Sequence, residues 1–72
     1  MIFGEIKKGD KLVLRVTKSD FKGKTYIDCR QHFLNAEGNW IPMKKGIAID
    51  AVHLSEYITM LEKAEKELAS KP

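Results

Sequence analysis

The residues best suited to chemistry lie in one short stretch, SDFKGKTYIDCRQHF, which runs from Ser19 to Phe33. Phosphate groups attract Lys and Arg, and unpaired bases stack on aromatic rings, so a mixture of the two is typical of surfaces that hold single-stranded nucleic acid. The stretch contains the cations Lys22, Lys24 and Arg30, with the phenylalanines Phe21 and Phe33 among them. Lys44, Lys45 and Trp40 extend the same mixture further along the chain.

Each of these residues also has a structural interpretation, which the sequence leaves open. Solvated surface charges are an alternative interpretation of the lysines at the hairpin tip. A place in the core is the alternative interpretation of Phe33 and Trp40. Arg30 has Asp28 and Glu37 as candidate surface partners. Strand parity adds a conflict, because Arg30 and Phe33 point to opposite faces of a regular strand unless it ends or bulges between them.

Catalytic and metal-binding patterns are weak. Asp50, His53 and Ser55 crowd the start of a predicted helix, where a cap and its first turn are the simpler interpretation. A single cysteine, Cys29, cannot form an internal disulfide, and we interpret it as a small buried apolar residue. With two distant histidines and no phosphate-binding glycine loop, we expect no metal, no cofactor and no enzymatic activity.

Composition indicates one small globular domain of 72 residues with 43% apolar content. The net charge is +3, but residues 1–50 hold ten Lys or Arg against six Asp or Glu, whereas residues 51–72 hold three against four. The basic excess therefore belongs to the part of the chain before the predicted helix. Neither a signal peptide nor a membrane span is predicted, so we expect an intracellular protein: cytoplasmic or nucleoid-associated in bacteria or phage, nuclear in eukaryotes.

Alternating apolar residues predict strands at Lys11–Lys18 and Lys24–Phe33, joined by a turn at Gly23. A turn at 35–39 leads to a third strand around Trp40–Met43, which Pro42 restricts to a sheet edge or a break. A corner at 44–46 precedes a short fourth strand at Ile47–Ile49.

Asp50 is a candidate N-cap for the uninterrupted helical stretch that follows it. The expected fold class is therefore α+β: a four-stranded antiparallel sheet and one C-terminal amphipathic helix (ββββα). Its expected bounds are a segment at 1–10, the sheet at 11–49 and the helix at 50–69, all in a single domain 1–72. The helix carries an apolar stripe that must be buried: Leu54, Tyr57, Ile58, Leu61, Ala64 and Leu68. Because a lone core of this size is marginal, a second copy of the chain is a natural partner.

The motifs together resemble a known family. DFKGK at 20–24, ID at 27–28 with Arg30, EG at 37–38, and Pro42 with KGI at 45–47 are similar to the core domain of the transcriptional coactivator positive cofactor four. The resemblance runs from about Leu12 to Leu68.

This resemblance implies a curved sheet, a homodimer whose helices form much of the interface, and channels that bind single-stranded or unpaired DNA with little sequence preference. It implies DNA contacts by Phe21, Lys22, Lys24, Arg30, Phe33 and Lys45, and thus favours a shared site despite the parity conflict. The implied interface residues are Leu54, Tyr57, Ile58, Leu61 and Leu68. Roles in transcription or in replication, recombination and repair are both compatible with a compact bacterial or phage-like member.

The sequence departs from the eukaryotic pattern in several places. Phe33 stands where those members carry tryptophan, and Ser19 and Ile41 stand at basic positions, so we expect less stacking and fewer phosphate contacts. We expect no counterpart of their regulatory Ser- and Lys-rich arm. The alternative functions are a module that recruits polymerase, activator or replication and recombination proteins through the helix, and an RNA-binding chaperone. No membrane partner is expected.

Overall fold

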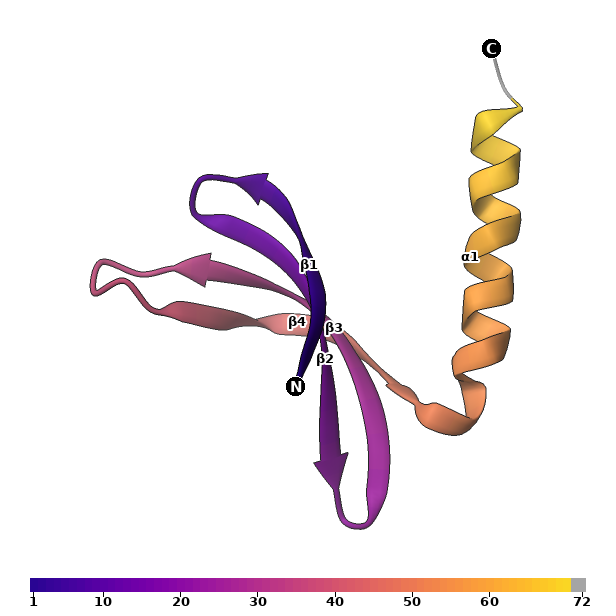
Figure 1. Cartoon of the computed structure of the whole chain (residues 1–72), viewed down its shortest axis with the longest axis horizontal. Coiled ribbons are helices and arrows are strands. Elements are labelled where there is room, and N and C mark those ends of the chain that lie inside the picture. Colours follow the sequence, from indigo (N-terminus) through magenta and orange to yellow (C-terminus); the bar gives the residue numbers. More distant parts are fainter. Residues whose placement is uncertain (71–72) are drawn as a thin grey trace.

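The computed structural model describes residues 1–70 and contains one sheet and one long helix (Figure 1). The elements follow one another along the chain: β1 Ile2–Gly9, β2 Leu12–Phe21, β3 Lys24–Leu34, β4 Trp40–Asp50, the 3-10 helix η1 Ala51–His53 and α1 Leu54–Ala69. The four strands lie in sequence order, each antiparallel to the next. The predicted fold class, four antiparallel strands followed by a C-terminal helix, is confirmed.

The first strand differs from the prediction, which placed residues 1–10 outside the sheet. β1 pairs with β2 from Ile2 opposite Thr17 to Gly9 opposite Leu12, so the sheet spans 2–50 and not 11–49. Register shifts at both ends of β1 interrupt its alternation, which is the reason the sequence pattern concealed it.

The predicted third and fourth strands are one continuous strand, β4. Arg30 lies opposite Gly46 and His32 opposite Pro42, so the single β3 residue between them faces the β4 segment 43–45. The expected corner at 44–46 is therefore a bulge, which bends a strand without ending it. β4 is an edge strand, as Pro42 predicts, because proline cannot donate a ladder hydrogen bond.

The β2–β3 hairpin closes through the two residues Lys22 and Gly23, both with positive φ, at 51° and 79°. Two positive φ values define the type I′ turn, whose twist matches that of paired strands. Glycine adopts this conformation freely, but Lys22 does so at a cost of about 1 kcal/mol. The tip of the hairpin thus holds a strained cationic residue.

Strand register divides the sheet into two faces. We call one the polar face; residues directly opposite one another on it include Ser19, Tyr26, Thr17, Asp28, Arg15 and Arg30. We call the other the apolar face; its central residues are Leu14, Val16, Ile27, Cys29, Ile47 and Ile49.

The helix begins later than predicted, at Leu54, after the 3-10 turn. Asp50 precedes that turn but makes no side-chain capping hydrogen bond, so its predicted capping role is wrong. Figure 1 shows α1 standing to one side of the sheet, joined to β4 through η1. No residue of α1 is buried. None of the helices among residues 1–70 is long and apolar enough to cross a membrane.

The single chain has very little core of its own. Val13 is the only buried apolar residue among those described. The radius of gyration is 14.5 Å, whereas a compact chain of this length has a value of roughly 11 Å. The fold is thus an open shape with much apolar surface left uncovered.

Candidate nucleic-acid interface

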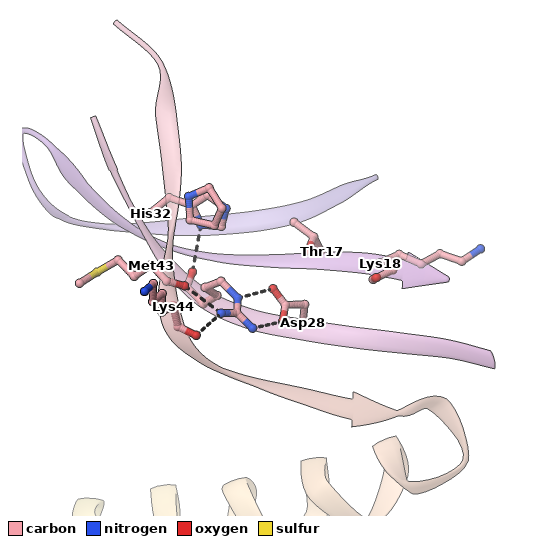
Figure 2. A pocket seen from close by; sticks show the side chains of 9 residues that line it. Thr17, Lys18, Asp28, His32, Met43 and Lys44 are labelled. Atoms are coloured by element: carbon pink, nitrogen blue, oxygen red, sulfur yellow. Dashed lines mark hydrogen bonds and ion pairs between the residues drawn. The ribbon is translucent and has the colours of Figure 1, made fainter. Parts of the chain in front are cut away.

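Arg30 lies opposite Arg15 and Gly46 on the polar face, and its guanidinium is held on two sides, by Asp28 and by the β4 bulge (Figure 2 shows these bonds). Nε donates to Asp28 Oδ2 and Nη2 donates to Asp28 Oδ1, both at 3.0 Å. Nη1 donates to the carbonyl oxygens of Met43 at 2.8 Å and Lys44 at 2.7 Å. One side chain therefore ties β3 to the bulge of β4.

These bonds use most of the hydrogen-bonding capacity of Arg30. A guanidinium has five N–H donors, and four are committed to Asp28 and the two carbonyl groups. The hydrogen bond to Asp28 raises the pKa of Arg30 above its ordinary value, so the charge persists at every accessible pH. Of the two structural partners considered from sequence, Asp28 is the one that Arg30 binds, and one N–H group is left over for a ligand.

Gly46 lies directly beneath this guanidinium. A Cβ atom at Gly46 would stand 2.6 Å from Cζ and 2.8 Å from Nε of Arg30, closer than real contacts allow. Its φ is not in the left-handed region, so the glycine is required for space and not for backbone freedom. The glycine of the KGI motif thus leaves the space that the Arg30 guanidinium occupies.

Arg15 lies directly opposite Arg30 on β2, and sequence reasoning did not include it in the site. Two like charges facing each other across a ladder destabilise a sheet. Here Arg15 Nε donates to Glu5 Oε1 at 3.0 Å, while Arg30 binds Asp28, so each cation has its own carboxylate. Strand parity, which assigns Arg15 and Arg30 to one face, could have identified the pair.

Trp40 lies on the polar face but is only partly exposed. The guanidinium of Arg15 lies 5.9 Å from the centroid of its ring, a cation–π contact. His32 beside it is buried, with Nδ1 donating to the carbonyl oxygen of Arg30 at 3.2 Å. Trp40 therefore combines a structural contact with residual exposure.

A hollow of about 610 Å³ opens on the polar face between β2, β3 and the β4 bulge (Figure 2). Its lining includes Thr17, Arg30 and Lys44. Lys45 belongs to the same bulge, so both lysines of the KKG segment are carried by the structure that Arg30 organises.

The hairpin tip adds the second group of predicted contacts. Phe21 is 61% exposed, and Lys22 Nζ lies 5.4 Å from the centroid of its ring. Lys24 lies opposite Phe21 on the polar face. An accessible ring and two cations therefore share one end of this face.

Phe33 is not brought to the polar face. It lies opposite Leu12 on β2 and Ile41 on β4, and is 41% exposed on the apolar face. The pairing of β3 with β2 is uninterrupted, so no bulge in β3 turns Phe33 toward Arg30. The bulge that occurs is in β4, and within one chain the parity conflict stands.

An apolar groove of about 370 Å³ lies between the apolar face and α1. It is lined by four of the five predicted interface residues, Leu54, Tyr57, Ile58 and Leu61, and by Phe3, Val16, Ile27, Cys29 and Ile49. The fifth, Leu68, does not line the groove and is 73% exposed. Burial raises the pKa of the Cys29 thiol above its ordinary value, and the charge of Asp28 adds to the effect. The thiol is thus neutral at physiological pH.

Among residues 1–70, no three His, Cys, Asp or Glu side chains come together in a way that would hold a metal ion.

The molecule is thus defined by an antiparallel four-stranded sheet with a basic and aromatic face, followed by a helix that leaves an apolar groove open. Residues 7–58 match the family described as Transcriptional Coactivator p15 (PC4), and the chain belongs to this family.

Solved structures share this fold. A PC4 homolog from Burkholderia pseudomallei is 24% identical, with a TM-score of 0.85 over 93% of this chain and 90% of that one. MoSub1, solved as a complex with single-stranded DNA, is 26% identical, with a TM-score of 0.63 over 92% of this chain and 76% of that one. The bacteriophage T5 homolog of PC4, implicated in recombination-dependent DNA replication, is 22% identical, with a TM-score of 0.55 over 94% and 97%.

Replacing Gly46 by Ala tests whether the Arg30 guanidinium needs the space above this glycine. The added methyl group would collide with a guanidinium held by four hydrogen bonds, and we expect a loss of about 1–3 kcal/mol in the free energy of unfolding. Urea denaturation followed by circular dichroism measures it.

Gly4→Ala is the matched control, because nothing lies within 4 Å of a Cβ at that strand position. Equal unfolding free energies for the two variants would contradict the role assigned to Gly46.

Proposed function

We propose that this protein is a dimeric single-stranded DNA-binding protein with little sequence preference. The observation that carries the proposal is the uncovered polar face with its unpaired cations. Among the described residues, none of the four predicted lysine contacts forms a salt bridge with a carboxylate: Lys22, Lys24, Lys44 and Lys45. Phosphates are the natural counter-ions for such a surface. The similarity to MoSub1, solved with single-stranded DNA, supports this choice of ligand.

In the proposed binding mode, the lysines contact phosphates and Phe21 stacks on a base. Arg30 acts mainly by holding the β4 bulge, and its remaining N–H is free for the strand. Trp40 contributes through its exposed part. Phe33 contacts the strand where it passes around the end of the sheet at the β3–β4 turn, because Phe33 lies near that turn on the other face.

The strain at Lys22 supports a binding role for the hairpin tip. The first position of this turn favours Asn, Asp or Gly, yet it holds lysine at a φ of 51°. Strained positions cluster at functional sites, where the side chain is needed for another purpose. A phosphate contact supplies such a purpose for Lys22.

The proposed dimer follows from the uncovered apolar surface. Ile58 and Leu61 are 46% and 51% exposed along the groove. A chain of this size buries little apolar surface, so a monomer that leaves these residues exposed loses much of its possible hydrophobic stabilisation. A second copy that presents the same groove and helix completes a self-complementary interface. A protein-recruiting role for the helix would require this same surface, which the second copy covers in the proposed dimer.

We propose no catalysis by this chain. His53 Nδ1 lies 3.4 Å from Glu56 Oε1, so it pairs within its own helical segment and forms no triad with Asp50 and Ser55. Binding and holding unpaired strands is the proposed activity, exercised in transcription as a coactivator or in replication, recombination and repair. An RNA-chaperone role would use the same polar face.

Salt dependence tests the proposed function. Titrating a labelled oligo-dT of about 20 nucleotides at several salt concentrations should give a slope of log K against log salt near −3 for four phosphate contacts in one channel. We expect a matched duplex to compete poorly. Weak, salt-independent binding to both ligands would contradict the proposal.

Charge variants locate the contacts in the same assay. Removing Lys22 and Lys24 together should reduce the slope by about 1.4, because each phosphate contact contributes about 0.7. The control removes Lys63 and Lys66, which carry the same charge on the helix. Equal effects of both pairs would indicate a response to net charge alone.

Leu61→Asp tests the dimer. The substitution places a charge in the groove, and burying an unpaired charge costs several kcal/mol, so we expect monomer or unfolded chain at micromolar concentration. Sedimentation velocity measures the outcome. Thr59→Asp, on the opposite side of α1, is the control and should leave the dimer intact. A Leu61→Asp dimer that sediments unchanged would contradict the interface.

A further inference from the structure

A second, smaller hollow lies on the polar face, between the Arg30 side chain and the tip of the β2–β3 hairpin. Its volume is about 360 Å³, and it is lined by Ser19, Phe21, Tyr26, Asp28, Arg30 and Ala48. Ser19 lies opposite Tyr26, and Asp28 opposite Ala48, so the register sets these side chains on one face of three neighbouring strands. The hollow is a product of regular pairing and needs no loop to form it.

Two aromatic rings border this hollow. Phe21 and Tyr26 are diagonal neighbours across the β2–β3 ladder, at a spacing that aromatic side chains can bridge. Phe21 is exposed, whereas Tyr26 is half-buried. Ala48 contributes only a methyl group and leaves the space between the strands open.

The polar groups of the hollow are partly unused. Within residues 1–70, neither the Ser19 hydroxyl nor the Tyr26 hydroxyl has a hydrogen-bond partner in the protein, and both are accessible to solvent. The Asp28 carboxylate is oriented by Arg30. Aromatic walls with a few polar groups suit a flat ligand whose faces are apolar and whose edge forms hydrogen bonds.

We propose that this hollow accepts one unstacked base of a bound single strand, with Tyr26 as its second aromatic platform beside Phe21. The inference rests on the proposed single-strand binding and specifies where a base is seated. Tyr26 provides, on the polar face, the ring that Phe33 cannot provide within the same chain. Lys24, opposite Phe21, is placed to contact the adjoining phosphate.

Tyr26→Leu tests the seat, because it keeps an apolar side chain and removes the ring. Base–aromatic stacking is worth about 1–3 kcal/mol, so affinity for oligo-dT should fall at least about fivefold. Tyr26→Phe keeps the ring and should retain most of the affinity. The matched ligand is an abasic oligomer with the same number of phosphates, whose affinity and salt slope Tyr26→Leu should leave unchanged.

The outcomes separate this inference from the function it rests on. If wild-type protein fails to bind oligo-dT, the proposed function falls. If wild type binds and Tyr26→Leu binds equally well, single-strand binding stands and the base seat is wrong. Equal weakening toward intact and abasic oligomers would also overturn the seat, because it would assign Tyr26 a structural role.

Discussion

The bidentate pair between Arg30 and Asp28, closed against the bulge of β4, is the interaction on which the polar face depends. A bulge leaves carbonyl groups without ladder partners, and unpaired polar groups are costly where water is excluded. Arg30 satisfies the carbonyl groups of Met43 and Lys44 with one nitrogen and is itself neutralised by Asp28. Gly46 makes this possible because it has no side chain in the space that the guanidinium occupies. The two lysines of the bulge are therefore held in place by an arginine that has little donor capacity left for a ligand.

The two faces of the sheet differ in chemistry, and the helix covers only part of the apolar face. The polar face pairs its inner charges, Arg15 with Glu5 and Arg30 with Asp28, and leaves its outer lysines free. The apolar face ends in a groove whose lining is exposed in the single chain. A chain with Val13 as its only buried apolar residue in the described part gains most from association. The proposed dimer would cover the apolar groove, which lies on the opposite side of the sheet from the polar face.

Much of the fold could be predicted from local chemistry. The turn at Gly23, the edge position of Pro42 and the strand parity that separates Arg30 from Phe33 follow from backbone rules and alternation, and the structure agrees with each. β1 was missed because register shifts at both its ends break the alternation, and β4 was divided because a bulge and a corner have the same glycine and lysine composition. Membership of the PC4 family was predicted from spaced motifs and is confirmed.

The site was harder to predict than the fold because it depends on contacts between strands. The roles of Arg15 over Trp40 and of Arg30 over Gly46 require the register, which a single sequence does not display. Tyr26 was overlooked because it alternates with apolar residues as any strand residue would. Its place beside Phe21 emerges only when β2 and β3 are paired.

The most direct test of the central claim is to measure Arg30→Lys by urea unfolding and by oligo-dT binding over a range of salt concentrations. Lysine keeps the charge but cannot reproduce the planar fork that binds Asp28 and two carbonyl groups at once. If Arg30 mainly positions the bulge, the midpoint of unfolding falls, affinity weakens and the salt slope becomes shallower, because Lys44 and Lys45 lose the positions from which they are proposed to contact phosphate. A variant as stable as wild type that binds DNA equally well would contradict the account, since charge alone would then be sufficient.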